Sequence, residues 1–98
     1  MHNNLLNTSK IFDAKIRIQM IASLYVSDLT FNQLKKICRC SDGNMTTHTK
    51  KLIKEEYVIV KKEFKDNKPL TTYHLTEKGR SEFVNYVNTL NNLIKGEE

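Results

Sequence analysis

The feature that most constrains the fold is a pair of short helical patterns separated by a tight connection. Residues 30–33, TFNQ, match a capping box, in which Thr caps the helix and Gln, three residues later, reaches back to the cap. Ser41 is a second N-cap, and Asp42 in the following turn suits the positive end of the helix dipole. Two short helices joined at Cys40-Ser41, with the second presenting polar groups, form the helix-turn-helix pattern.

The second helix of this pair has two chemically different faces. The side chains that recur at helical spacing, and are therefore expected to be buried, are Met45, Thr49, Leu52 and Ile53. The opposite face carries Asn44, Thr46, Thr47, Lys50, Lys51 and Lys54, none of which is acidic. Asn can pair with a base edge, Thr can bond to or touch one, and Lys can meet phosphate. This face suits the DNA major groove; the plainer alternative is an amphipathic helix whose polar face is only solvated.

The residues before and within the first short helix predict apolar surfaces that are buried beneath the helix pair. Apolar residues are dense over residues 12–26, FDAKIRIQMIASLYV, which predicts a helix buried on more than one side. Leu29 is expected to form a short edge strand beside a later hairpin. In the helix that follows, the residues expected to be buried are Phe31, Leu34, Ile37 and Cys38.

After Tyr57 the apolar period changes from helical to two, which predicts a β-hairpin. Residues 66–69, DNKP, are expected to form the turn, and residues 71–75 the returning strand. Pro69 cannot donate to a ladder, so a central strand position is excluded for it. The residues expected to face inward are Val58, Val60, Phe64, Tyr73 and Leu75.

A last helix is predicted over residues 77–95, with Thr76 as its cap and Gly96 suited to its C-terminal end. Its apolar residues step by four, three and four, a seam that suits pairing with another helix. Together with an arm at residues 1–10, this seam suggests a homodimer. The predicted interface residues are Leu5, Leu6, Phe12, Phe83, Val87, Leu90 and Ile94. In the alternative, the helix packs on its own domain, and the arm of the same chain covers part of the seam.

Composition and charge set the broad class of partner. The 98 residues suit one domain, spanning 1–98, and carry a net charge of +5. Residues 35–68 hold ten Lys or Arg and five Asp or Glu, so this segment alone accounts for +5. The excess favours a polyanion. No apolar run reaches the roughly 18 residues of a membrane span, and the start MHNNLLNTSK does not have the pattern of a secretory signal, so a cytoplasmic location is expected.

The sequence contains little that indicates catalysis or a cofactor. It has no nucleophile elbow, P-loop or H-E-x-x-H motif, so we expect no enzyme activity and no cofactor. Cys38 and Cys40 form a C-x-C pair, but zinc needs about four ligands, and only Asp42 and His48 lie close in sequence. We therefore interpret the cysteines as structural, with no metal site. A metal- or thiol-responsive role remains the alternative.

The predicted order of helix, helix-turn-helix, β-hairpin and helix is the winged-helix arrangement. The segments FDAKIRIQMI, TFNQLKKI, SDGNMTTHTKKL, EEYVIVKKEF and KPLTTYHLTEKGR, with a closing F-x6-L-x2-LIK, resemble small single-domain winged-helix transcriptional regulators related to the MarR and ArsR groups. The resemblance covers residues 10–95. It implies a dimeric DNA-binding repressor or activator, with one helix in the major groove and the hairpin, or wing, near the backbone.

Carried over by position, the resemblance places Asp42, Gly43 and Asn44 at the start of the recognition helix. The whole set expected to contact DNA is Ser41, Asn44, Thr46, Thr47, Lys50, Lys51, Lys62, Lys65, Lys68 and Thr72. Such proteins often have Leu where this chain has Cys40 and Thr49. The wing tip lacks Arg and Gly, so lysine contacts to phosphate are expected rather than insertion of an arginine into the minor groove.

The sequence therefore predicts a mainly α fold with a β-hairpin wing, α-α-α-β-β-α, and an extra strand near Leu29. The predicted function is sequence-specific binding of double-stranded DNA by a homodimeric transcriptional regulator. The rival is a protein-binding winged helix whose basic face docks on an acidic partner. No effector can be named from the sequence.

Overall fold

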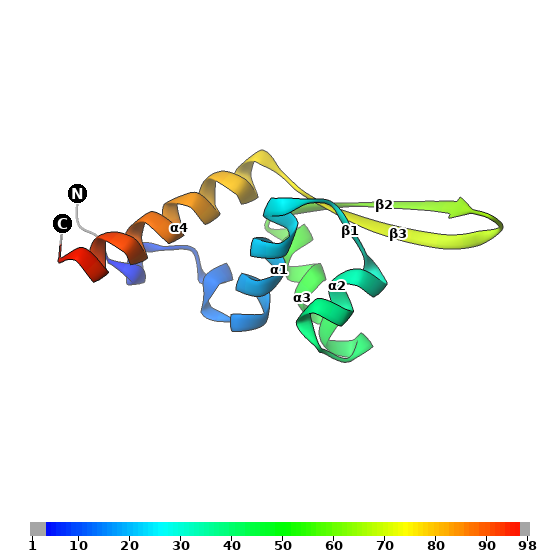
Figure 1. Cartoon of the computed structure of the whole chain (residues 1–98), viewed down its shortest axis with the longest axis horizontal. Coiled ribbons are helices and arrows are strands. Elements are labelled where there is room, and N and C mark those ends of the chain that lie inside the picture. Colours follow the sequence, from blue (N-terminus) through cyan, green and yellow to red (C-terminus); the bar gives the residue numbers. More distant parts are fainter. Residues whose placement is uncertain (1–3, 97–98) are drawn as a thin grey trace.

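The helices and strands follow one another in the predicted order in the computed structural model, which describes residues 4–96 (Figure 1). The elements are η1 (Leu5–Asn7), η2 (Lys10–Asp13), α1 (Lys15–Val26), β1 (Leu29–Thr30), α2 (Phe31–Cys38), α3 (Asp42–Lys54), β2 (Val58–Lys65), β3 (Lys68–Leu75) and α4 (Glu77–Lys95). The predicted fold class is confirmed, including the short strand at Leu29. The first three residues of the predicted arm lie outside the described residues. Within residues 4–96, no helix is both long and apolar enough to cross a membrane.

The first long helix begins later than predicted. Phe12 belongs to the 3-10 helix η2, and Ala14 is extended (φ −116°, ψ 122°), so α1 starts only at Lys15. Arg17 stabilises this break, because its Nε donates to the carbonyl oxygen of Ile11 (2.8 Å) and its Nη2 to that of Lys10 (3.1 Å). These two carbonyls would otherwise lie at the end of a helix with no continuing turn to satisfy them.

The core lies where α1, α2, α3 and the base of the sheet meet. Its buried apolar residues are Ile11, Phe12, Met20, Ile21, Leu24, Leu34, Met45, Leu52, Tyr57, Val58, Tyr73 and Leu75. Two residues predicted to be buried are not, since Ile37 is 44% and Ile53 37% exposed. Each lies at the edge of its helix's apolar stripe, where it lines an open groove instead of packing on another element.

Thr49 is a polar residue in the apolar stripe of α3, and its hydrogen bonds explain why it is found there. Its hydroxyl donates to the carbonyl oxygen of Met45 (2.7 Å) and forms a side-chain hydrogen bond with Tyr73. Tyr73 is buried, which raises the pKa of its phenol, and a buried hydroxyl needs a polar partner inside the core. A leucine in place of Thr49 would remove that partner.

The sheet is antiparallel with strand order β1-β3-β2, so β3 is its central strand. β3 begins at Lys68 and includes Pro69, whereas the prediction started the strand at residue 71. Pro69 is tolerated because β1 pairs only with Thr72 and Tyr73, so the distal part of β3 has β2 as its one neighbour. The turn is Asp66-Asn67, with φ of 53° and 63°, a pair of left-handed residues typical of type I′ hairpins.

The distal half of the hairpin extends beyond the helices (Figure 1). Of the residues predicted to face inward, Val58, Tyr73 and Leu75 are buried and Val60 is half-buried. Phe64 is 79% exposed, so the prediction was wrong there. Phe64 lies on the same face of β2 as Val58 and Val60, as the alternation predicted, but the strand extends beyond the core.

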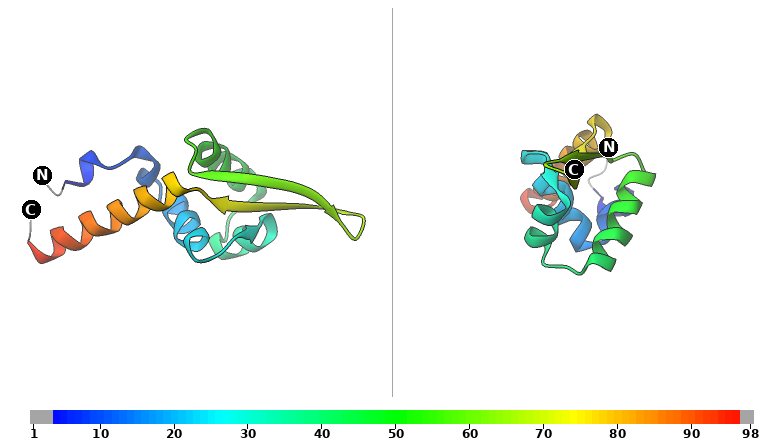
Figure 2. Two further views of the ribbon diagram at one scale, coloured as in Figure 1. Left: turned by 90° about the horizontal axis from the view of Figure 1, so that it is seen from above. Right: turned by 90° about the vertical axis from the view of Figure 1, so that its right-hand side faces the viewer.

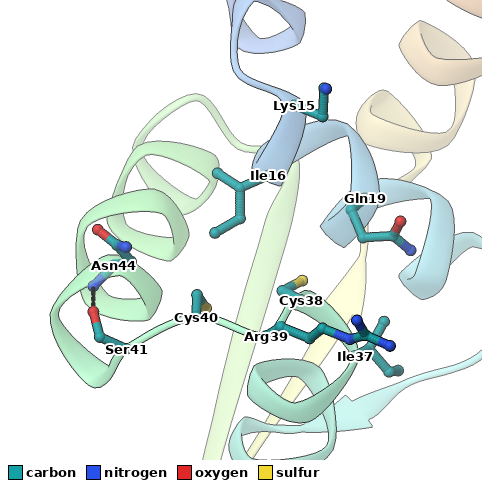
Figure 3. A pocket seen from close by; sticks show the side chains of 9 residues that line it. All are labelled: Lys15, Ile16, Gln19, Ile37, Cys38, Arg39, Cys40, Ser41 and Asn44. Carbon is teal, nitrogen blue, oxygen red and sulfur yellow. Dashed lines mark hydrogen bonds between the residues drawn. The ribbon is translucent and has the colours of Figure 1, made fainter.

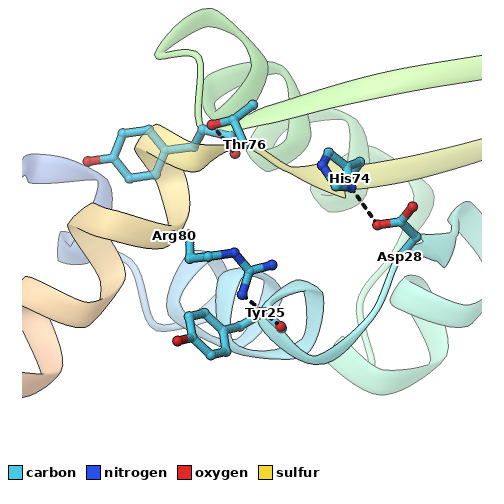
Figure 4. A network of polar contacts seen from close by, with 6 residues as sticks. Tyr25, Asp28, His74, Thr76 and Arg80 are labelled. Atoms are coloured by element: carbon cyan, nitrogen blue, oxygen red, sulfur yellow. Dashed lines mark hydrogen bonds and ion pairs between the residues drawn. The ribbon is translucent and has the colours of Figure 1, made fainter.

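α4 is held to the domain at its first turns by backbone and ring contacts (Figure 4). Thr76 caps the helix, accepting from the Gly79 N–H (3.0 Å) and donating to the carbonyl oxygen of Glu56 (2.7 Å). Arg80 donates to the carbonyl oxygen of Tyr25 (3.2 Å) and lies over the Tyr25 ring, 4.5 Å from its centroid. The start of α4 is thus tied both to the end of α1 and to the residues that follow α3.

Two further contacts complete this attachment. The Phe12 ring stacks on Tyr86 of α4, with centroids 4.4 Å apart. At the other end of the junction, His74 Nδ1 of β3 and Asp28 Oδ1, in the connection between α1 and β1, are 2.7 Å apart (Figure 4). Both contacts join segments far apart in sequence, so the direction of α4 and the base of the wing are set together.

Gly79 is the position where the close packing of α4 is most sensitive to substitution. A Cβ there would lie 2.5 Å from the carbonyl oxygen of Tyr57 and 2.7 Å from Leu75 Cδ1. We expect Gly79→Ala to lower the free energy of unfolding by about 1–3 kcal/mol, measured by urea denaturation. Gly43→Ala is the control, because its Cβ would meet only Ser41 Oγ at 3.8 Å, and it should leave stability unchanged or raise it slightly. Equal effects of the two changes would contradict this packing.

Candidate nucleic-acid interface

The turn between α2 and α3 presents the start of α3 to the outside. α2 ends at Cys38, and its C-cap Arg39 takes the left-handed conformation (φ 52°, ψ 46°) and donates its N–H to the carbonyl oxygen of Lys35. Ser41 then caps α3, since its Oγ accepts from the Asn44 N–H at 3.1 Å. The capping box of α2 and the N-cap of α3 are both confirmed. α3 therefore begins at a defined position, with its first turn exposed.

The polar face of α3 is free to meet a partner. Of the side chains that the sequence placed on this face or at its cap, all are exposed: Ser41, Asn44, Thr46, Thr47, Lys50, Lys51 and Lys54. The Thr46 hydroxyl donates to the carbonyl oxygen of Asp42 (3.0 Å) and the Thr47 hydroxyl to that of Gly43 (2.9 Å). Because their protons are engaged by the backbone, these hydroxyls present acceptor lone pairs and methyl groups outward.

The acidic residue at the start of α3 is neutralised by its neighbour. Lys35 Nζ and Asp42 Oδ1 are 2.7 Å apart. An exposed pair of this kind contributes little to stability. Its electrostatic effect is local, because it cancels the negative charge nearest to Asn44 and leaves Lys50, Lys51 and Lys54 as the excess charge of this face.

The cations of the wing divide between its two faces. Lys65 and Lys68 are paired across the strands and share a face with Thr72, which is half-buried between Thr30 and Lys61. Lys62 is one position out of phase and lies on the other face, beside Phe64. The four predicted wing residues therefore do not form one contact surface. Lys61, which the prediction left out, is 3.7 Å from Glu63 Oε2 and so is partly neutralised.

An open groove of about 490 Å³ runs between α1 and the α2–α3 turn (Figure 3). Lys15, Ile16 and Gln19 line it from α1, and residues 37–41 with Asn44 line it from the other side. The prediction did not include Lys15 or Arg39 among the DNA contacts, although both line the same groove as Asn44. Arg39 is one of the basic residues that give residues 35–68 their net charge, so the charge pattern could have pointed to it. The packing of α1 against the turn, which forms the groove, could not be predicted from that pattern.

The two cysteines border the same groove and show no sign of a reactive site. Burial raises the pKa of the Cys38 thiol to about 11, with a smaller contribution from nearby Cys40. A thiol with that pKa is protonated near pH 7, which makes it a poor nucleophile and a poor metal ligand. Across residues 4–96, no group of three or more His, Cys, Asp and Glu side chains is arranged to hold a metal ion.

His48 packs against α1 on the buried side of the polar face. Its Nδ1 lies 3.3 Å from Arg17 Nη1. A guanidinium only donates, so Nδ1 is the acceptor and the neutral ring carries its proton on Nε2. Burial lowers the pKa of His48 from its ordinary 6.5, and the Arg17 charge lowers it further. His48 is therefore a neutral packing residue that joins α3 to α1.

This lowered pKa predicts acid sensitivity. Because the folded state disfavours protonated His48, its contribution to stability is complete above pH 6.5 and is lost as the pH falls below 6.5 through the folded-state pKa. His48→Gln keeps an acceptor for Arg17 without a titrating group, so its urea midpoint should fall less than that of the wild type between pH 7 and pH 5. An NMR titration of His48 with a midpoint above 6.5 would contradict the assignment.

Proteins similar to this chain share its winged-helix arrangement. A family model described as a winged helix DNA-binding domain matches residues 16–94. An uncharacterised protein of Methanocaldococcus jannaschii is 36% identical over 90 residues, covering 91% of this chain and 98% of that protein.

Solved structures show the same fold. A transcriptional regulator homologue from Pyrococcus horikoshii OT3 superposes with a TM-score of 0.85 at 24% identity, covering 94% of this chain and 91% of that one. A protein described as a MarR-family transcriptional regulator, from Porphyromonas gingivalis W83, has a TM-score of 0.69 at 18% identity, covering 88% and 80%. At these identities the likeness concerns the fold alone.

Proposed function

Because the chain belongs to the family of winged helix DNA-binding domains, as its resemblance implied, we propose that it regulates transcription as a homodimer that binds duplex DNA at specific sequences. The observation that carries this proposal is the exposed polar face of α3, which combines one amide, two hydroxyls and three lysines and has no unpaired acid. The rest of the domain leaves this face uncovered, and the opposite face of α3 packs into the core through Met45 and Leu52.

Base reading is assigned to the first two turns of α3. The Asn44 amide has no hydrogen-bond partner within residues 4–96, so it is free to pair with a base edge. Thr46 and Thr47 offer acceptors to the exocyclic amines of adenine or cytosine and methyl groups to thymine. Lys50 and Lys51, further along the helix, would meet phosphates and set its register on the duplex.

The wing supports the proposal through an unfavourable charge pair. Lys65 and Lys68 lie directly opposite each other at the end of the ribbon, an arrangement that destabilises a hairpin. An anion at the tip would relieve this repulsion, as DNA phosphate would. Lys62 would reach phosphate from the other face. Thr72 lies nearer the base of the wing and would contribute least.

The dimer is proposed to form at the end of the molecule opposite the wing tip. There η1 and the C-terminal half of α4 lie side by side (Figure 2). Leu6 is 89% and Ile94 83% exposed, and Leu5, Val87 and Leu93 are partly exposed as well. Phe12 was expected in this interface, but it is only 6% exposed and is covered by its own chain. Phe83 and Leu90 are half-buried, so they would contribute mainly at the interface edge.

Two alternatives can be weighed against these observations. An acidic protein partner would be satisfied by the lysines alone and would leave the amide and hydroxyls at the start of α3 without a purpose. A metal- or thiol-responsive repressor would need further ligands around Cys38 and Cys40, and the surrounding described residues do not supply them. Duplex DNA would engage the amide, the two hydroxyls and the three lysines of the polar face of α3.

Base reading and phosphate contact should separate in a pair of substitutions. We expect Asn44→Ala to weaken binding of the dimer to a duplex selected from a random pool by about 30-fold or more, because each subunit loses a base contact worth ~1–3 kcal/mol, while binding to random duplex is unchanged. Lys65→Ala should weaken both equally and reduce the slope of log K against log salt by about 2 for the dimer, from a wild-type slope of about −5 to −7. Fluorescence anisotropy measures both, with Asn85→Ala as a distant control. Equal losses on the two duplexes from Asn44→Ala would refute its role as a base reader.

The dimer can be tested without DNA. Ile94→Glu places a charge in the exposed apolar surface and should weaken self-association at least tenfold in sedimentation equilibrium. Asn85→Glu adds the same charge to the same helix at an exposed polar position and should leave the mass unchanged. If the wild type sediments as a monomer at micromolar concentration, the proposed interface is wrong. A functional dimer should also protect two half-sites about 34 Å apart in footprinting.

A further inference from the structure

The wing carries an aromatic side chain that its own chain does not cover. Phe64 is 79% exposed and sits one residue before Lys65, the last residue of β2. Its cross-strand partner is Pro69, which is also exposed. Partners in an antiparallel ladder project from the same face, so the two form one small apolar surface at the end of the ribbon.

Neither the core nor the third strand reaches this surface. β1 ends at Thr30 and pairs only as far as Thr72, and a groove of about 240 Å³ lies between residues 30–32 and residues 69–71. A phenylalanine that is 79% exposed leaves a large apolar area in water, and burying it would contribute roughly 1.5–3 kcal/mol. The surface therefore has a substantial gain available from a partner.

The charges around Phe64 indicate what that partner is. Lys62 lies on the same face, and Lys65 and Lys68 follow at the tip on the opposite face. Glu63 on the opposite face is engaged by Lys61 at 3.7 Å, and Asp66 occupies the turn itself. An apolar centre between cations matches a duplex, in which apolar base faces lie between two rows of phosphates.

We propose that Phe64, backed by Pro69, is an apolar wedge that the wing inserts between base pairs in the minor groove next to the recognition helix, unstacking one step and bending the duplex. This inference rests on the proposed function and adds to it a mode of contact with the bases. Phe and Pro are among the side chains that proteins use for such wedges, and the resulting kinks, of about 20–90°, bend the duplex toward the major groove, where α3 would lie.

The length of the overhang fits this geometry. Beyond the Lys61–Thr72 pair, where β1 ends, β2 continues from Lys62 to Lys65. At ~3.4 Å per residue this gives about 14 Å of free ribbon before the turn. Half a helical repeat of DNA is about 17 Å, the distance from a major groove to the neighbouring minor groove. A minor groove ~6 Å wide is too narrow for two strands, so entry requires the groove to open, which a wedge brings about.

The test uses the full chain and duplexes selected from a random pool, with 2-aminopurine placed in turn at each step flanking the α3 site. The wild type should increase fluorescence at one flanking step and bend the duplex, as measured by energy transfer between end labels. Phe64→Ala should abolish the fluorescence increase, reduce the bend and weaken affinity about fivefold or more, with an unchanged salt slope because no phosphate contact is lost. Phe64→Leu, which keeps a wedge, should retain most of the bend.

Ile59→Ala is the matched control, because Ile59 is also exposed (58%) on β2 but lies on the opposite face near the base of the wing. It should change neither fluorescence nor bend, and thermal melts should show all three variants folded. Wild-type binding with a normal salt slope but no unstacking would overturn the wedge while leaving the proposed function intact. Absence of any duplex binding would overturn both. Self-association that Phe64→Ala abolishes would instead assign the surface to a second copy of the chain.

Discussion

The close packing of the first turn of α4 against the backbone of Tyr57 sets the arrangement of everything else. The Tyr57 N–H closes the end of α3 by donating to the carbonyl oxygen of Leu52 (2.9 Å), and its own carbonyl oxygen accepts from the Thr76 N–H (2.9 Å). Gly79 lies against the same carbonyl, where no side chain fits. One residue thus joins the end of α3, the base of the sheet and the start of α4.

The side chain of Tyr57 extends this junction to the N-terminal arm. Its ring is buried against Phe12, with centroids 6.0 Å apart, and Lys78 lies over it at 5.6 Å. Its hydroxyl hydrogen-bonds with Ser9, which also accepts from the Ile11 N–H at 3.2 Å. The wing and α4 leave this junction in opposite directions (Figure 2). The DNA-facing end and the self-associating end of the proposed dimer are therefore separated by the length of the molecule.

The parts of the fold that were predictable are those governed by local chemistry. The capping residues Thr30, Ser41 and Thr76, and the αL residue Gly96, act through hydrogen bonds or backbone conformations within a few residues, so the sequence pattern determines them. The exposed face of α3 follows from its helical period in the same way. Strand alternation was also predictable, because a pleat of period two is local.

The errors arose where an element's environment depends on distant segments. Phe64 has the correct phase for burial, but whether it is buried depends on how far the helices extend under β2. Ile37 and Ile53 have the helical spacing of core residues, yet each lies at a groove. Pro69 has no N–H to donate, so it prevents strand pairing on one side only. It therefore fits in the central strand β3 beyond the point where β1 has ended. The role of Arg17 in ending η2 and packing on His48 required tertiary contacts that no local pattern contains.

The two ends of the molecule expose apolar side chains in different electrostatic surroundings, and this difference bears on which partner each end takes. At the wing, Phe64 and Pro69 lie among lysines, so a second copy of the wing would bring like charges together and be repelled, whereas a polyanion would not. Along the C-terminal half of α4, Ile94 and Val87 lie among asparagines, with Lys95 as the one charged residue of 86–95, so a second copy of the same helix meets little like charge. Both exposed surfaces reduce the stability that the isolated chain could reach, and each is consistent with one partner: duplex DNA at the wing and an identical chain at α4.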